Sequence, residues 1–73
     1  MIHQADRELK ASWRARFLQL PPEARHALRR ALLDLRNDAL LRAQAQWRAH
    51  KAPMACYWKV VGVYAGHLAR ALR

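Results

Sequence analysis

The sequence has few of the residues that form loops, crosslinks and nucleophilic catalytic sites. Its 73 residues include no threonine, one serine, one cysteine and two glycines. Cys56 has no second cysteine in the chain to bond with, which favours a reducing, cytoplasmic environment, and we expect it to be a buried thiol. Because turn-forming residues are scarce, the sequence predicts helices joined by few loops.

The same shortage argues against enzymatic activity. A nucleophilic Ser, Thr or Cys needs a general base beside it. The single serine has no such neighbour in the sequence, and Pro53 separates Cys56 from His50. Asp34 and Asp38 are interspersed with arginines, so we expect them to form ion pairs rather than act as an acid and a base. The sequence therefore predicts a protein without a catalytic site.

Patterns that bind metals and cofactors are also missing. The four histidines, His3, His26, His50 and His67, lie too far apart in the sequence for any two to share a helical turn. No glycine-rich loop of the kind that holds a phosphate is present. We therefore expect no metal, no cofactor and no small-molecule substrate, and we expect His67 to be a hydrogen-bonded residue at the edge of the core.

No segment predicts a membrane span or a signal peptide. The longest uncharged stretch is Val60 to Ala69, which lies between Lys59 and Arg70. It is about half the length that a transmembrane helix requires, so we interpret it as a buried helix face. The N-terminal residues lack the apolar core of a signal peptide. Together with the lone cysteine, this predicts a cytoplasmic protein.

Positive charge is the dominant feature of the composition. Lys and Arg total 14 against 5 Asp and Glu, for a formal net charge of +9. Such a charge on a small chain attracts polyanions such as nucleic acid, an anionic membrane or an acidic protein surface. Alternatively, the arginines form an ordinary solvated surface, because a bias toward Ala, Arg and Leu is typical of GC-rich bacterial genomes.

Prolines divide the chain into three segments with helical periodicity. We expect helices over about residues 4–20, 22–51 and 54–72, forming one all-α domain over residues 1–73. The predicted architecture is a helical hairpin or small bundle built on the long middle helix. Pro53 is expected to end that helix, with Ala52 extended, and its continuity past Asn37 stays open. A strand over Lys59 to Tyr64 is the less favoured alternative, since it has no partner strand.

Apolar residues form stripes that are expected to pack the helices together. They are Leu9, Trp13, Phe17 and Leu20 in the first segment, Leu28, Leu32, Leu35 and Ala39, and separately Leu33, Leu40 and Trp47, in the second, and Met54, Trp58, Val61, Ala65, Leu68 and Leu72 in the third. Gly62 and Gly66, with Ala55 and Ala69, predict a small-residue groove for the long helix or a second copy. Because one short chain cannot easily cover both stripes of the middle helix, we also expect self-association.

Two groups of cations are candidates for binding a partner. One is an arginine stripe on the middle helix, which suits a phosphate backbone. The other is the segment Trp47 to Lys59, where aromatic residues alternate with cations. That pattern is typical of nucleic-acid binding and of protein interfaces, and it also fits an aromatic mini-core in which Trp47 packs on Trp58 or Tyr57. The candidate binding residues are Arg25, Arg29, Arg36, Arg48, His50, Lys51, Tyr57 and Lys59.

These features predict a small, basic, non-enzymatic binding protein. The favoured partner is nucleic acid, contacted through the arginine-rich helix face. The alternative is a protein-binding adaptor or inhibitor, such as an anti-defence protein of a mobile element, that docks on an acidic surface of a larger complex. Peripheral membrane attachment is a third, less favoured interpretation. Exposed aromatic rings would favour a protein interface, and buried rings would favour phosphate binding alone.

Overall fold

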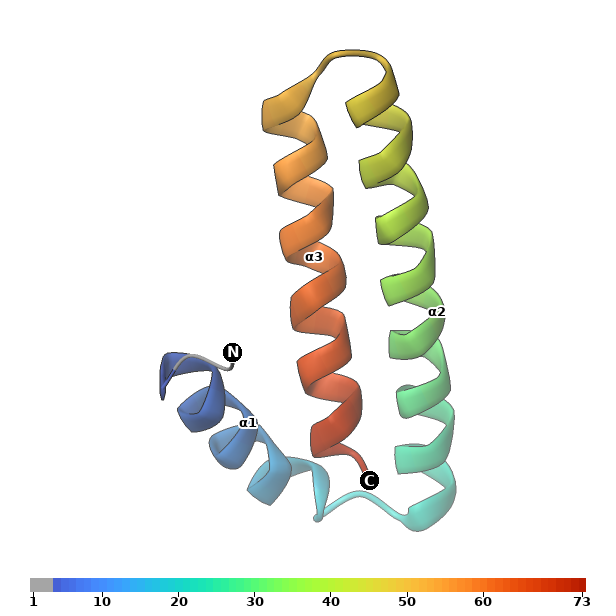
Figure 1. The fold of residues 1–73 in the computed structure, drawn as a ribbon. Coiled ribbons are helices and arrows are strands. Elements are labelled where there is room, and N and C mark those ends of the chain that lie inside the picture. The colour runs from blue at the N-terminus through green and yellow to red at the C-terminus, as the bar shows by residue number, and fades with distance from the viewer. Residues whose placement is uncertain (1–3) are drawn as a thin grey trace.

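A computed structural model describes residues 4–73 as three α-helices (Figure 1). They are α1 (Gln4–Phe17), α2 (Pro22–Arg48) and α3 (Ala52–Ala71). The helices α2 and α3 form an antiparallel hairpin, and α1 packs beside the C-terminal half of α3. None of the three is apolar enough over a sufficient length to cross a bilayer. The predicted all-α hairpin or small bundle is confirmed, and the strand alternative is wrong.

Helix α2 is continuous through Asn37 and extends for about 40 Å. It begins at Pro22, where the missing N–H costs no intrahelical bond, and Glu23 complements the helix dipole in the first turn. An ion pair of 2.9 Å between Asp38 and Arg42 links successive turns near its middle. The sequence left the continuity of this helix open, and the structure shows one unbroken helix from Pro22 to Arg48.

The turn between α2 and α3 forms at His50 rather than at Pro53. His50 has a φ of 59°, in the left-handed region. Its N–H donates to the carbonyl of Trp47 at 3.0 Å, which closes α2. Helix α3 then begins at Ala52, with Pro53 in its first turn. This differs from the expected extended Ala52, because a proline near a helix start has no intrahelical bond to break.

Small residues of α3 allow α2 to approach closely. A Cβ added to Gly62 would lie 3.2 Å from Cδ2 of Leu40 and 3.4 Å from the carbonyl oxygen of Arg36. A Cβ added to Gly66 would lie 3.3 Å from Cδ of Arg36. The other small residues buried on this side of α3 are Ala55, Ala65 and Ala69. The predicted small-residue groove is therefore confirmed, and α2 of the same chain fills it.

The core is small and lies where the end of α1 meets the hairpin. Phe17, Ala71 and Leu72 form it, and Leu28, Leu32 and Leu68 pack against it partly buried. Within residues 4–73, no large side chain is fully buried. Members of the predicted stripes that remain exposed include Trp13, Leu20, Leu35, Leu40, Trp47 and Met54. The fold therefore covers the apolar stripes only in part.

Candidate nucleic-acid interface

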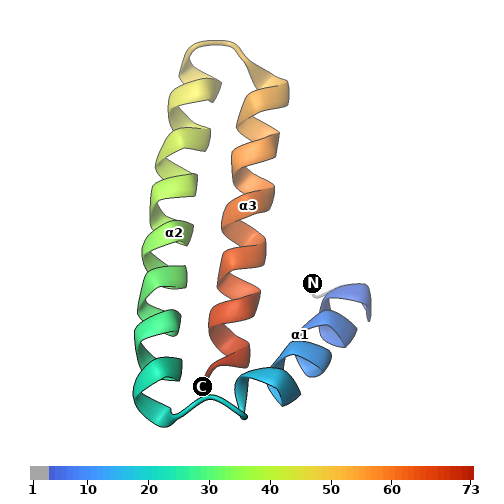
Figure 2. The same ribbon diagram turned by 180° about the vertical axis from the view of Figure 1, so that it is seen from behind.

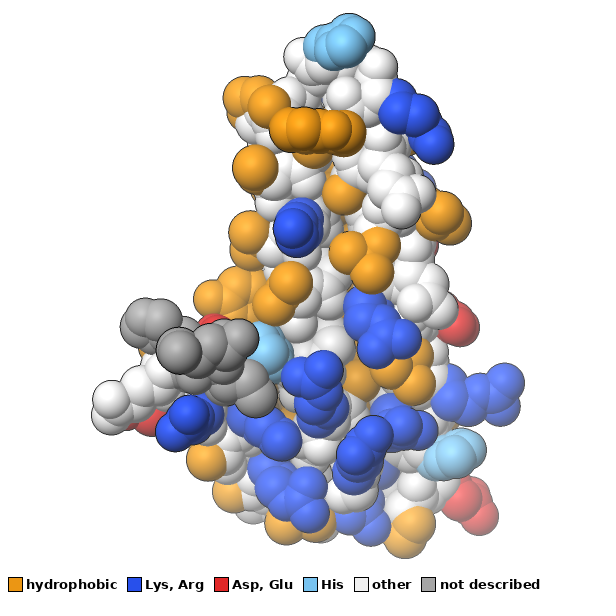
Figure 3. All heavy atoms as spheres, viewed as in Figure 1, with side chains coloured by type: hydrophobic (Ala, Val, Ile, Leu, Met, Phe, Trp, Pro, Cys, Tyr) orange, Lys and Arg blue, Asp and Glu red, His pale blue; other side chains and the backbone are white. Residues whose placement is uncertain are grey.

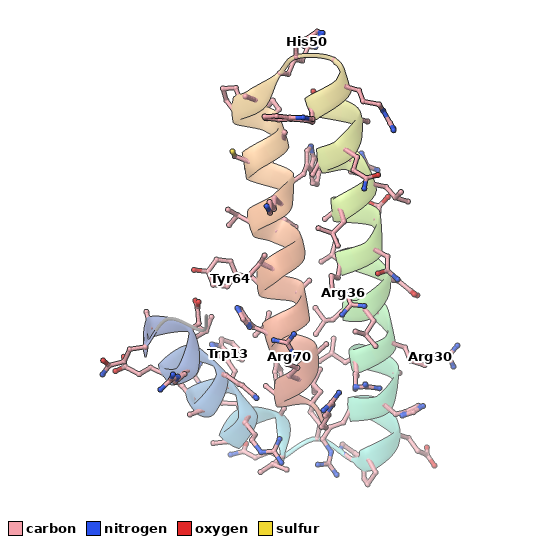
Figure 4. The ribbon with its side chains drawn as sticks, in the orientation of Figure 1. Trp13, Arg30, Arg36, His50, Tyr64 and Arg70 are labelled. Carbon is pink, nitrogen blue, oxygen red and sulfur yellow. The ribbon has the colours of Figure 1, made fainter. Side chains whose placement is uncertain are left out.

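One side of the hairpin collects cations from both of its helices. This basic face consists of Arg25, Arg29 and Arg36 of α2 with Lys59 and Arg70 of α3, and it is turned toward the viewer in Figure 3. Lys and Arg side chains gather over its lower part, and apolar side chains spread over its upper part. Figure 4 shows Arg36 and Arg70 on this side, whereas Arg30 points away from it at the edge of the molecule.

The predicted stripe of Arg25, Arg29 and Arg36 is half-buried along the seam with α3. The Nε atoms of Arg25 and Arg29 are buried without a hydrogen-bond partner. These two residues line a shallow pocket of about 250 Å³ with Pro22, His26, Leu72 and Arg73. Burial of the alkyl stems leaves the guanidinium groups at the surface, where Arg36 donates only to Oδ1 of Asn37 at 3.5 Å, and none of the three contacts a carboxylate.

Carboxylates do not neutralise this cluster. Among residues 4–73, Arg42 is the only Lys or Arg in an ion pair, and it contacts Asp38 away from the basic face. Unpaired cations held close together repel one another, and the low dielectric near a half-buried site strengthens that repulsion. The cluster is therefore electrostatically complementary to an external anion with several charges.

Of the two cations that α3 contributes to the basic face, Lys59 was predicted from the sequence and Arg70 was missed. Arg70 is exposed, and its Nη1 lies 3.4 Å from Nδ1 of His67. His67 is buried, with 8% of its surface exposed, and its Nε2 lies 3.8 Å from Oδ2 of Asp6 in α1. The expectation of a polar His67 at the edge of the core is confirmed. The antiparallel hairpin places the end of α3 beside the start of α2, and that pairing was the available signal for Arg70.

The other predicted residues lie toward the opposite end of the hairpin. Arg48 is about 35 Å from Arg25 along α2, and His50 and Lys51 form the turn (Figure 4). Tyr57 and Lys59 are two residues apart in α3, so they project from nearly opposite sides of that helix. Only Lys59 of this pair belongs to the basic face. The structure thus divides the predicted set between the two ends of the hairpin and excludes Tyr57 from this face.

An apolar groove continues the basic face toward the turn. It has a volume of about 580 Å³ and is lined by Leu40, Ala43, Gln44, Trp47, Arg48, Ala55, Cys56 and Lys59. The indole of Trp47 is 67% exposed, so an aromatic mini-core that includes Trp47 is wrong. Tyr57 and Trp58 instead pair edge to face at 5.2 Å, and Arg42 lies 5.1 Å over the Trp58 ring. The groove presents an exposed aromatic surface beside cations.

Cys56 lies in this groove with an exposed thiol. The expectation of a buried thiol is wrong. Ala55 and Gly62 point toward α2, and Cys56 is rotated by about 100° from Ala55, out of the helix–helix contact.

No group of three or more His, Cys, Asp or Glu within the described residues is arranged to hold a metal ion. His3 lies outside the described residues. Comparison with protein-family models, with curated proteins and with solved structures gave no match. The chemistry available on the basic face consists of guanidinium groups without carboxylate partners, one ammonium group and an exposed indole. These groups bind anions and stack on planar rings.

Proposed function

We propose that this chain is a non-enzymatic cytoplasmic protein that binds nucleic acid through its basic face. The observation that carries the proposal is the cluster of Arg25, Arg29, Arg36 and Arg70, which has no carboxylate partner among the described residues. Guanidinium groups form bidentate hydrogen bonds with phosphate oxygens, and a row of them follows a charged backbone. The lone cysteine supports a reducing compartment.

The dimensions of the face suit a strand of nucleic acid. Arg25 and Arg36 lie about 16 Å apart along α2, which equals the rise of about five nucleotides in a duplex. Trp47 is exposed beyond them, next to Arg48 and Lys59 in the apolar groove. An indole in that position is suited to stacking on a base of a single strand, while the arginines contact the phosphates.

Fluorescence anisotropy with labelled single-stranded DNA, duplex DNA and RNA tests this proposal. Because four arginines replace condensed counterions, we expect log K to fall with log salt at a slope of about −3 to −4. The absence of detectable binding to any of the three at about 50 mM salt would contradict the proposal. The order of the three affinities identifies the preferred partner, and stacking by Trp47 predicts that single strands bind more tightly than the duplex.

Exposure of Trp47 favours a second candidate function, a protein-binding adaptor or inhibitor. Its partner would be an acidic surface of a larger complex, with Trp47 as the aromatic anchor and Arg48 and Lys59 as flanking cations. Affinity capture with the whole chain, carried out after nuclease treatment, separates the two functions. One stoichiometric acidic partner that resists nuclease and is lost on Trp47→Ala would establish this second function.

A further inference from the structure

The side of the hairpin opposite the basic face is apolar along most of its length. On α2, Leu28 and Leu35 lie on the other side of the buried Ala39 from Arg36. The α3 residues on that side are Met54, Tyr57, Trp58, Val61 and Leu68, none of them charged. We call these seven residues the apolar face. Leu28 and Leu68, at its lower end, pack against the core that includes Phe17 of α1, and in Figure 2, which views the molecule from behind, no helix lies over the rest of the hairpin.

On this side α2 carries three charged residues, Asp34, Asp38 and Arg42, and two of them neutralise each other. Asp38 and Arg42 form their 2.9 Å ion pair there, with the Arg42 guanidinium over the Trp58 ring. The basic face on the other side of the hairpin cannot pack on a copy of itself, because its cations have no counter-charge. The apolar face therefore is a surface on which two copies of a +9 chain can meet without placing unpaired cations in contact.

The single chain exposes more surface than a compact monomer of its mass, as a subunit separated from its partner would. A folded monomer of 8.5 kDa is expected to expose about 4,700 Å², whereas this chain exposes 5604 Å². The difference is close to the area of roughly 800 Å² that each partner buries in a standard interface. The radius of gyration is 13.7 Å, against about 11 Å for a compact domain of this length.

We propose that a second copy of this chain covers the apolar face. Helical domains bury the apolar sides of their helices between two packed layers, and the α2–α3 hairpin supplies one such layer. A two-fold axis through this face would pair two hairpins into a four-helix bundle. Both basic faces then point outward from the bundle. This inference is independent of nucleic-acid binding, because the two sides of the hairpin have different residues.

Sedimentation equilibrium of the whole chain at roughly 0.5 M salt, where repulsion between copies is screened, measures the proposed dimer. The wild type is expected to have twice the monomer mass of 8.5 kDa. Leu35→Glu places a charge on the apolar face at a side chain that is 42% exposed in the single chain, and it is expected to give monomers. Leu41→Glu is the matched control, since Leu41 is 65% exposed on the side of α2 away from α3 and is expected to leave the dimer intact.

Circular dichroism of each variant shows whether the hairpin remains helical. If Leu35→Glu unfolds, Met54→Glu provides the same test at a side chain that is 44% exposed in the first turn of α3, where an acid favours the helix. A wild-type monomer at high concentration would overturn the proposal and leave the apolar face to a different protein. Equal loss of dimer in Leu41→Glu and Leu35→Glu would overturn it as well.

The exposed thiol of Cys56 identifies which face forms the dimer. Cys56 lies in the groove that continues the basic face, so a dimer through the apolar face leaves it accessible. We expect a thiol reagent to react at the same rate with the wild-type dimer and with the Leu35→Glu monomer. Protection of Cys56 in the wild-type dimer would show that the copies pack through the opposite side and would refute the assignment.

Discussion

Arg36 has two separate functions within one side chain. Its alkyl stem lies over Gly66, where an added Cβ would be 3.3 Å from Cδ, so the stem is part of the contact between α2 and α3. Its guanidinium belongs to the basic face beside Arg70 (Figure 4). Long cationic side chains often cover apolar surface in this way while the charged group stays at the water boundary. A substitution that shortens Arg36 therefore affects packing as well as charge.

Removal of a cation from the basic face should weaken nucleic-acid binding more than removal of a cation elsewhere. In Arg70→Gln, we expect the slope of log K against log salt to become less negative by about one unit. The matched control is Arg30→Gln, which removes the same charge at the edge of the molecule, away from the basic face, and should keep the slope. Anisotropy titrations at several salt concentrations measure both, and equal changes of slope would show that net charge alone determines binding.

His50 adopts a strained backbone conformation in the turn between α2 and α3. Its φ of 59° is unfavourable for any residue with a Cβ, and glycine adopts that conformation freely. His50→Gly is therefore expected to raise the free energy of unfolding by about 0.5–1 kcal/mol. His26→Gly, within α2, should instead lower it by about 1 kcal/mol. Urea denaturation at one fixed protein concentration compares the two, and destabilisation by His50→Gly would mean that its side chain makes a contact that stabilises the turn.

The two helices contribute side chains of different size to the contact between α2 and α3. Helix α3 presents small residues, and α2 places larger side chains over them. A Cβ added to Gly62 would contact both the side chain of Leu40 and the backbone oxygen of Arg36. A Cβ added to Gly66 would contact only the flexible alkyl stem of Arg36. Backbone atoms cannot move aside without displacing the helix, but a partly exposed stem can rotate away. The two glycines should therefore tolerate substitution differently.

Gly62→Leu is expected to lower the free energy of unfolding by about 1–3 kcal/mol, because the larger side chain has no space against α2. Gly66→Ala should change it by less than about 1 kcal/mol, since the gain in helix propensity offsets the shift of the Arg36 stem. Val63→Leu, at a position 45% exposed to solvent, is the control and is expected to have little effect. Denaturant titrations measure the free energy of unfolding of each variant. A loss at Gly62→Leu no larger than that at Gly66→Ala would contradict the close approach of α2 at Gly62.

At the scale of the whole molecule, the two sides of the hairpin differ in chemistry. One side carries unpaired guanidinium groups and an exposed indole, and the other carries apolar residues and one neutral ion pair. The core between them includes no fully buried large side chain among the described residues. A chain of this length has little stability to lose, so a second copy on the apolar face would supply a large share of it.

If the chain folds as a dimer through the apolar face, its thermal stability depends on its concentration. Mass action raises the unfolding midpoint of a dimer as the protein concentration rises. We expect the wild type and Leu41→Glu to unfold several degrees higher after a hundredfold increase in concentration. Leu35→Glu should have a lower midpoint that does not depend on concentration. Differential scanning calorimetry over that range measures the three curves, and a concentration-independent wild type would argue against the dimer.

Local features of the sequence were sufficient to predict the secondary structure. Prolines at positions 21, 22 and 53, few glycines and apolar residues at helical spacing predicted three helices and an all-α hairpin or small bundle. Helix formation depends on contacts within four residues, so a single sequence contains most of the required information. The turn was misplaced by a few residues because the left-handed conformation of His50 has no marker in the sequence.

Tertiary structure alone decided which side chains are covered and which cations gather. Trp47 and Cys56 were expected to be buried and lie exposed. Cys56 is turned out of the contact because the Ala55, Gly62 and Gly66 side of α3 faces α2, and Trp47 lines the open groove beside it. Arg70 joins the arginine stripe only because the chain folds back antiparallel. Burial and charge clustering depend on pairs of residues distant in the sequence, and helical periodicity does not specify how those pairs are brought together.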